Sequence, residues 1–366
     1  MAEAPMQVWL MEPLPVGVAQ RLKRLRHAPG VARVAVMPDV HVAGDFCVGT
    51  VVATRETLFP VAVGGDIGCG MLALRFDAPA EKLADADAAA RVLGLLYELS
   101  PTRRHHRKLA PALPETLCEV PLDDAARLEF GTLGGGNHFL ELQRDGADGL
   151  WLMLHTGSRH FGQMVFERHL PKARKVDGFH VFDAGSAEGQ AYLRDVQLAR
   201  LYARENRLAI ARAVMRVLEM AIGASPVEGT LIDCDHNHLA VEEHDGEMLF
   251  VHRKGATTAH TEQMGVIPGS MGTKSYHTRG RGLAAALSSS SHGAGRALTR
   301  TQAREAVTKS ALRRQLRGVW YDSRIERQLI EEAPAAYKSI DRVMTAQAEL
   351  VVIERELRPV LVYKGV

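Results

Sequence analysis

Cysteine is scarce in this sequence: four of its 366 residues are cysteines, and they form no CxxC pair. A disulfide framework is improbable in a chain of this length, so the pattern indicates a reducing compartment with one or two metal thiolates. Long apolar runs are missing too, since no stretch approaches the roughly 20 residues that span a bilayer. Residues 1–16 lack the charged and apolar segments of a secretion signal. We therefore expect a cytoplasmic protein with no membrane span.

The sequence also has no large net charge, no internal repeat and no low-complexity tract longer than residues 288–291. Its apolar content of 46% excludes a disordered chain and suffices for one large core or two moderate ones. The formal net charge of +2 says little about partners, because it hides local basic clusters. Strand-like and helix-like stretches alternate, and no break in composition marks a linker.

Hydrophobic periodicity places the main elements. Apolar residues recur at helical spacing in residues 79–99 and in 186–222, where one long helix or a broken pair is expected to end at Gly223. A short basic helix is expected over residues 15–27. Further apolar or alternating stretches predict strands at 31–37, 46–54, 59–63, 70–76 and 151–154.

Residues 64–71, GGDIGCGM, carry an acid and a thiol on a tight glycine loop after the strand expected at 59–63. Glycines adopt positive φ and let a ligand approach the backbone, so Asp66 and Cys69 can face one ion. Taken alone, the octapeptide is equally consistent with a turn in which the aspartate caps a backbone N–H and the cysteine packs in the core.

Three histidines occur in similar glycine or asparagine settings: His138, His155 and His236. Imidazoles and thiolates bind divalent transition metals, so these histidines are expected to complete a metal site with Asp66 and Cys69. Five ligands exceed the needs of one tetrahedral ion. Either some of them only support the others, or two ions lie roughly 3.5–4 Å apart. Ligand softness alone favours zinc or iron, and each histidine taken singly is more often a hydrogen-bonded core residue.

Small residues dominate a second group of segments at 253–256, 267–273 and 288–296. Backbone N–H groups and hydroxyls in such loops bind anions, and Lys254 and Arg296 add positive charge, so phosphate is the expected guest. His292 stands there with nothing bulky beside it. A neutral imidazole is a nucleophile, which makes in-line attack on phosphorus the favoured role, with hydrogen bonding to a phosphate as the alternative. The stretch at 269–275 lacks the spacing of a Walker A loop.

Seven segments occur together in the order typical of one known family: VMPDVH (36–41), DIGC (66–69), GTLGGGNH (131–138), HTGSR (155–159), PGSMG (268–272), SHGAGR (291–296) and KG (364–365). Over nearly its whole length the sequence resembles the RtcB family of RNA-splicing ligases, in particular its short bacterial branch. The resemblance implies a single α/β domain over residues 1–366, with mixed sheets around a dinuclear metal pocket and peripheral helices. It also implies a ligase that joins RNA 3′-phosphate or 2′,3′-cyclic phosphate ends to 5′-hydroxyl ends with GTP and Mn²⁺.

The same resemblance implies roles for individual residues. Cys69 would bridge two Mn²⁺ ions, with Asp66 and His138 on one and His155 and His236 on the other. His292 would attack the α-phosphorus of GTP and form a histidine–GMP intermediate. The residues implied to hold the nucleotide are Asn137, Glu141, Pro268, Gly269, Ser270, Met271, His292, Gly293, Ala294, Gly295, Tyr337 and Lys364, with Lys364 reaching the guanine.

RNA needs a surface of its own, and three basic features are candidates. Arg159, next to the expected ligand His155, is the preferred RNA phosphate contact, and Arg296 is the second. The stretch from Arg296 to Trp320 has Glu305 as its only acid, so it predicts either a phosphate-binding track or a solvated helix face. Residues 101–114 are basic and punctuated by proline, which indicates a solvated loop or else a phosphate-contacting arm.

The sequence departs from the family pattern at Val42–Asp45, His160 and His238, and it is shorter than most members. These changes spare the expected metal and nucleotide positions, so they concern substrate choice, which in the compact bacterial branch is thought to be cleaved ribosomal RNA. Splicing of tRNA is the other natural role. Two functions of other classes remain open: a metal-dependent phosphoesterase acting on RNA ends, and a non-catalytic protein that binds RNA ends.

Overall fold

A large sheet forms the centre of the computed structural model, which describes residues 3–365; Met1, Ala2 and Val366 of the predicted 1–366 unit lie outside the described residues. Its strands are paired in the order β10-β5-β7-β6-β18-β15-β14, with β17 added to β18. Their bounds are β5 (Gly70–Pro79), β6 (Phe139–Asp145), β7 (Gly149–Thr156), β10 (Ile232–Asp235), β14 (Met264–Ile267), β15 (Ser275–Gly280), β17 (Trp320–Tyr321) and β18 (Val351–Lys364). The terminal strands β10 and β14 contact each other, so the sheet is nearly closed into a barrel.

Three smaller sheets surround the large one. A five-stranded sheet contains β1 (Met6–Val8), β2 (Val31–His41), β3 (Val48–Thr54), β12 (Glu247–Lys254) and β11 (Asn237–His244), in that order. A two-stranded sheet pairs β13 (Ala256–Thr258) with β16 (Ser289–Ser291). A three-stranded sheet has the order β4 (Thr57–Leu58), β9 (Phe179–Asp183) and β8 (Arg174–Val176). Most pairs are antiparallel, but β1 with β2 and β17 with β18 are parallel, so the predicted mixed α/β class is confirmed.

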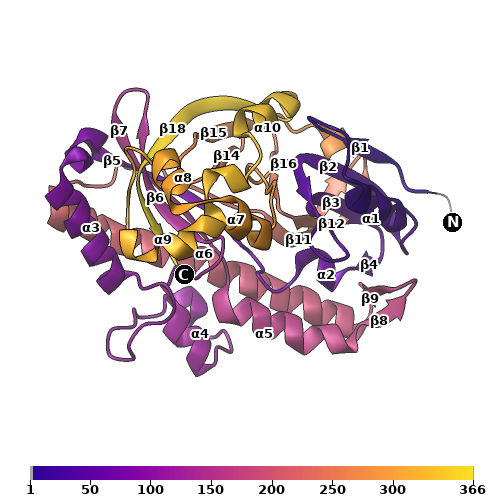
Figure 1. Cartoon of the computed structure of the whole chain (residues 1–366). Coiled ribbons are helices and arrows are strands. Elements are labelled where there is room, and N and C mark those ends of the chain that lie inside the picture. The colour runs from indigo at the N-terminus through magenta and orange to yellow at the C-terminus, as the bar shows by residue number, and fades with distance from the viewer. Residues whose placement is uncertain (1–2, 366) are drawn as a thin grey trace.

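Helices cover the outside of the sheets (Figure 1). They are α1 (Val16–Arg26), α2 (Pro60–Val63), α3 (Ala86–Leu99), α4 (Asp124–Glu129), α5 (Arg159–His169), α6 (Ala187–Ile222), α7 (Arg300–Ala306), α8 (Lys309–Gln315), α9 (Glu326–Leu329) and α10 (Ile340–Ala346). Helix α6 is unbroken over 36 residues and is followed by Gly223, which has φ 64°. The helix end predicted at this glycine is therefore confirmed. None of the helices within residues 3–365 has the combination of length and hydrophobicity that a membrane span demands.

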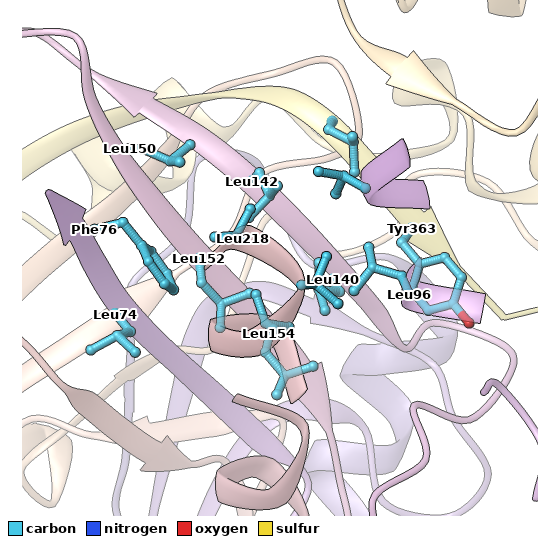
Figure 2. Close-up of a cluster of buried hydrophobic side chains, with 14 of the residues drawn as sticks. Leu74, Phe76, Leu96, Leu140, Leu142, Leu150, Leu152, Leu154, Leu218 and Tyr363 are labelled. Atoms are coloured by element: carbon cyan, nitrogen blue, oxygen red, sulfur yellow. The ribbon is translucent and has the colours of Figure 1, made fainter. Parts of the chain in front are cut away.

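The main hydrophobic core lies between the large sheet and helices α3 and α6 (Figure 2). Leu150, Leu152 and Leu154 alternate along β7, so all three point to this face, where they meet Leu96 of α3 and Leu218 of α6. The intervening residue Met153 packs inside the nearly closed sheet instead. The core therefore fixes which face each strand of the large sheet presents.

The strand expected at 59–63 is wrong: Pro60–Val63 form the short helix α2. Proline at the first helical position has the φ that a helix needs, and Gly64, with φ 75°, ends the turn. The N–H of Phe59 donates to His252 Nε2 at 3.0 Å rather than to a neighbouring strand. A buried apolar run of five residues has no periodicity that separates a helical turn from a strand.

Candidate active site

Antiparallel register brings the predicted metal ligands to one end of the large sheet. The start of β5 lies beside the end of β7, because Met71 pairs with His155, and beside the end of β10, because Gly70 pairs with Asp235. The start of β6 joins them through the pair Phe139 and His155. Cys69, His138 and His236 are the residues next to these strand ends, so segments separated by more than 160 residues meet at one point.

The five predicted ligands form two groups that share Cys69. Its sulfur lies 3.5 Å from His138 Nε2 and 3.2 Å from His155 Nε2. His138 Nε2 is 3.0 Å from Asp66 Oδ2, and His155 Nε2 is 3.1 Å from His236 Nε2. One group able to hold an ion is therefore Asp66, Cys69 and His138, and the other is Cys69, His155 and His236.

His155 Nε2 lies against both the Cys69 sulfur and His236 Nε2, an arrangement of donor atoms that a cation would stabilise. His155 Nδ1 lies 3.0 Å from the carbonyl oxygen of Asn137, so Nδ1 carries the proton and Nε2 turns a lone pair toward Cys69 and His236. Burial lowers the pKa of His155 well below its usual value, and burial with the neighbouring His292 does the same for the pKa of His236. Both rings are therefore neutral and able to bind metal.

The pKa values of the acid and the thiol in the cluster are shifted in opposite directions. Burial raises the pKa of Asp66, but the ion pair and hydrogen bond with His138 outweigh it and bring that pKa to about 2. Burial, reinforced by the Asp66 carboxylate, raises the pKa of Cys69 well above its usual value. A cation beside the sulfur would reverse the second shift by stabilising the thiolate. The donor set thus fits divalent metal.

The glycines of the 64–70 loop are needed for two different reasons. Gly68 has φ +71°, which residues with a side chain rarely adopt. Gly70 has an ordinary φ, but a Cβ there would lie 2.4 Å from the carbonyl oxygen of Cys234, so a side chain would push β5 away from β10. Both glycines are required to hold Cys69 beside His236.

His292 enters the same site from a different sheet. It directly follows β16, whose Ser291 pairs with Ala256, and the N–H of Ala256 donates to the carbonyl oxygen of His236 at 3.1 Å. The ring centroids of His292 and His236 are 4.8 Å apart. The predicted nucleophile therefore lies against one predicted metal ligand.

Asp39, on β2, orients the His292 ring. Its Oδ2 accepts a hydrogen bond from His292 Nδ1 at 2.6 Å and a longer one from the His292 backbone N–H at 3.3 Å. The Asp39 side chain is fully buried, and within residues 3–365 its Oδ1 has no hydrogen-bond partner. A proton held on Nδ1 by a carboxylate leaves the Nε2 lone pair free, which is the tautomer a nucleophile needs.

A cavity of about 810 Å³ opens beside His292 and the metal cluster. That volume lies within the range of about 300–1,000 Å³ typical of small-molecule sites. All twelve predicted nucleotide-contacting residues line it, as do Asp66, Cys69, His155 and His236. The geometry therefore brings the predicted metal and nucleotide positions together, although their roles remain predictions.

Opposite charges gather at a part of this cavity lined by β18 and the segment before α10. Lys364 Nζ lies 3.5 Å from Glu332 Oε2 and donates to the carbonyl oxygens of Gly136 and His138 at 3.1 and 3.3 Å. Glu332 also accepts from the Tyr337 hydroxyl and pairs with Arg296 at 3.0 Å. Burial raises the pKa of nearby Glu141 to about 8, while burial lowers the pKa of Lys364 against the pull of Glu332.

Sequence reasoning missed Asp39 and Glu332 as members of the site. Asp39 lies inside the VMPDVH segment, so its position was marked, but its contact with His292 spans 253 residues of sequence. Glu332 lies in an acidic pair before an alanine and a proline, and nothing local distinguishes it from a surface acid. Only the fold reveals that it faces three predicted site residues.

The predicted RNA contacts are partly engaged with acids. Arg159 is mostly buried, 3.4 Å from Glu129, and its Nε donates to Thr132 Oγ1 at 3.3 Å. In the basic stretch, Arg300 and Arg304 pair with Glu331 and Arg313 pairs with Glu326. These acids come from residues 326–332, which the count of charges up to Trp320 did not include. These three arginines are therefore compensated by acids of the protein itself, and the choice between a phosphate-binding track and a solvated helix face stays a prediction.

The three departures from the family pattern lie in different settings. Val42 and Ala43 line the cavity, whereas Asp45 is exposed and pairs with Arg24 at 3.7 Å. His160 Nε2 lies 3.0 Å from Asp123 Oδ2 at the start of α5, away from the cavity. His238 is fully buried behind the metal cluster, with Nδ1 2.9 Å from Asp235. Only the first departure touches the rim of the cavity directly.

Comparison with known proteins agrees with this geometry. A family model described as tRNA-splicing ligase RtcB matches residues 21–121 and 114–365. The chain is 34% identical to the RNA-splicing ligase RtcB of Escherichia coli (strain K12) over 401 aligned positions, which cover 99% of this chain and 98% of that protein. It is 31% identical to the RNA-splicing ligase RtcB of Mycobacterium tuberculosis, covering 87% of this chain and 93% of that protein. It is also 36% identical to the tRNA-splicing ligase RtcB of Nanoarchaeum equitans, covering 65% and 60% respectively.

Proposed function

This chain belongs to the RtcB family of RNA-splicing ligases, and we propose that it joins RNA 3′-phosphate or 2′,3′-cyclic phosphate ends to 5′-hydroxyl ends at the expense of GTP. One observation carries the finer part of this proposal: His292 lines the large cavity, 4.8 Å from the His236 ring, with its Nδ1 bound to Asp39. A ring held in this way has one free nitrogen, Nε2, and the ring lines the cavity in which a nucleotide would bind.

The reaction would begin on His292. Its Nε2 forms a bond to the α-phosphorus of GTP, and the bond from that phosphorus to the bridging oxygen breaks, releasing pyrophosphate. An oxygen of the RNA 3′-phosphate then takes the guanylate from the histidine. The 5′-hydroxyl of the second RNA attacks the activated phosphate, loses its proton and displaces GMP. Asp39 supports the first step by stabilising the positive charge that the ring gains as it bonds to phosphorus.

Two Mn²⁺ ions are the proposed metals, one held by Asp66, Cys69 and His138 and the other by Cys69, His155 and His236. When bound, divalent cations of this kind offset negative charge on phosphate oxygens during transfer. The shared sulfur supports a dinuclear arrangement, because Cys69 belongs to both groups. The Asp66 carboxylate suits manganese, and the choice of manganese over softer metals follows the family resemblance, which takes precedence over the argument from ligand softness.

The nucleotide would occupy the cavity with its base near β18. Lys364, Glu332 and Glu141 provide a donor and two acceptors there, which is the pairing that a guanine edge requires. Ser270 and the backbone of residues 268–271 and 293–295 line the part closer to His292, where triphosphate oxygens would lie. Residues from β2, β6 and β18 share this cavity, which supports the proposal that residues 1–366 act as one domain.

RNA is the proposed partner, through Arg159 and Arg296, with repair of cleaved ribosomal RNA as the first natural role to examine and tRNA splicing as the second. Both arginines border the site, Arg159 beside the loop that carries His138 and Arg296 in the cavity wall. We also propose that the protein works in the cytoplasm, where free thiols such as Cys69 stay reduced.

Incubation with α-labelled GTP and Mn²⁺ tests the proposal. We expect an acid-labile label on the wild-type protein, none on His292→Ala, and a normal label on His260→Ala, which removes an exposed histidine outside the cavity. Ligation of labelled 3′-phosphate and 5′-hydroxyl RNAs should follow the same pattern. Label on His292→Ala would refute the nucleophile. Dephosphorylation without GTP would favour a phosphoesterase, and binding with neither activity would favour an RNA-end binding protein.

A further inference from the structure

A second cavity, of about 800 Å³, lies between residues 101–112 and helix α6. Its walls include Arg104, His106 and Leu109 from the loop and Arg212 and Arg216 from the C-terminal half of α6. None of these residues belongs to the site described above. The cavity is bordered by Gly131, the first residue of the glycine loop that leads to His138.

The positive charge of this cavity is not compensated by the protein. Within residues 3–365, no carboxylate lies within 4.0 Å of the side-chain nitrogens of Arg103, Arg104, Lys108, Arg212 and Arg216, although Arg107 pairs with Asp124 at 2.8 Å. Glu98 is the one acid among the lining residues. This contrasts with the arginines of α7 and α8, which pair with acids. Exposed cations left without partners indicate a polyanionic ligand.

Apolar and aromatic surface lies next to these cations. Leu109 is 71% exposed, an unusual fraction for a leucine, and it lines the cavity with Pro101, Pro111 and the exposed ring of His106. Single-stranded RNA offers both features that such a surface would meet, because its phosphates bind arginine and its unstacked bases pack on flat or apolar side chains. A duplex keeps its bases stacked and would leave this apolar part unused.

The loop also connects the second cavity to the metal centre. The carbonyl oxygen of Thr102 accepts a hydrogen bond from the N–H of Gly134 at 2.8 Å. A Cβ at Gly134 would lie 2.4 Å from His138 Nδ1 and 2.5 Å from Arg159 Nη1. Residues 102–104 therefore begin beside the loop that carries the predicted metal ligand His138 and reach the second cavity at Arg104, so one short segment joins the two sites.

We propose that this basic groove, defined by Arg104, Arg212 and Arg216, binds the phosphodiester backbone of a single-stranded RNA end several nucleotides from the phosphate being joined. The proposal rests on the RNA ligase function given above and extends it from the reacting ends to the strand behind one of them. It gives a role to the C-terminal half of α6, which does not line the nucleotide cavity.

The test compares two triple variants. Arg104→Gln/Arg212→Gln/Arg216→Gln removes three cations of the groove, and Lys172→Gln/Arg174→Gln/Lys175→Gln removes three exposed, unpaired cations around β8, on the far side of the molecule from α3 (Figure 1). Binding of fluorescent single-stranded RNA is measured by anisotropy over a range of salt concentrations. The association constant falls as salt concentration rises. For the groove variant, losing three phosphate contacts should make the slope of log K against log salt less steep by about 2, and the control should keep the wild-type slope.

Ligation kinetics give the second measurement. For the groove variant, KM for a long RNA should rise roughly 10-fold or more, while kcat, guanylation of His292 and KM for an RNA too short to reach the groove stay unchanged. Equal salt slopes for the two triple variants would overturn the proposal and leave an acidic protein as the candidate occupant. Equal losses for duplex and single-stranded RNA would overturn the single-strand assignment. Failure of wild-type guanylation would instead refute the proposed function, so the two failures are distinguishable.

Discussion

The hydrogen bond between Asp39 and His292 leads to the sharpest prediction about catalysis. Asp39→Asn keeps the size and shape of a fully buried side chain but replaces a charged acceptor with a neutral amide. If the amide oxygen faces His292 Nδ1, the ring keeps its tautomer and loses only the charge of its partner. If the amide nitrogen faces Nδ1, it donates, the ring proton moves to Nε2, and the nucleophilic lone pair is lost.

The magnitude follows from the difference between charged and neutral hydrogen bonds. Bonds to charged groups contribute about 1.5–3 kcal/mol and neutral ones about 0.5–1.5 kcal/mol, so the favourable orientation should lose about 1–2 kcal/mol of transition-state stabilisation. That corresponds to a reduction of about 5- to 30-fold in the rate of guanylation. A larger reduction would indicate that the amide nitrogen faces the ring.

Single-turnover labelling with α-labelled GTP measures this rate directly. GTP affinity is determined separately, and we expect it to change little, because Asp39 contacts the histidine and not the open cavity. Asp77→Asn, which removes an exposed carboxylate bound to the Ser225 N–H, serves as the matched control. Guanylation of Asp39→Asn at the wild-type rate would refute the view that the charge of Asp39 stabilises the His292 ring in the transition state.

Two further predictions concern the metal cluster and the nucleotide cavity. Cys69→Ser should lose bound Mn²⁺ from both groups, whereas His236→Ala should lose it from one, because only the cysteine is shared. Metal analysis after dialysis measures the number of bound ions. Retention of both ions by Cys69→Ser would contradict the prediction. Burial raises the pKa of Glu141 from 4.5 to about 8, so the folded state holds a proton that the unfolded chain has already lost at intermediate pH. This contribution to stability is complete below about pH 4.5 and disappears as the pH rises through about 8. The free energy of unfolding of Glu141→Gln minus that of wild type should therefore be larger at about pH 8.5 than at about pH 5.5, as measured by urea unfolding. An equal difference at both pH values would show that the carboxyl does not titrate in this range.

The sequence predicted which residues meet at the candidate metal cluster, because they lie in short segments of distinctive composition. Glycine, cysteine and histidine at 64–71 and at 131–138 carry information that survives without any knowledge of the fold. The helical periodicity and the final glycine also placed helix α6 and its end, but they left open whether it was one helix or a broken pair. The apolar run at 59–63 was not, because the proline and glycine at its ends suit a helical turn as well as a strand boundary.

Pairings between distant residues could not be predicted from one sequence. The basic stretch from Arg296 to Trp320 contains one acid, Glu305, but Glu326, Glu331 and Glu332 fold back onto it from beyond Trp320. The cations at Arg212 and Arg216 gave no signal either, because on a long helix they are typical of a solvated face. Their significance depends on the loop at 101–112, which lies more than 100 residues earlier in the chain.

The residues of the site come from strands that are far apart in the sequence. The side chain of Asp39 comes from β2, the metal ligands come from the ends of β5, β7 and β10, and Lys364 ends β18. In antiparallel pairs, a slip of one residue would turn His155 to the opposite face of the sheet and away from Cys69. The leucines of β7 that pack against α3 and α6 oppose such a slip, because it would remove all three of them from this core. The hydrophobic core on one face of the large sheet therefore maintains the geometry of the metal cluster at its end, and a substitution in that core should weaken metal binding even though it lies outside the cavity.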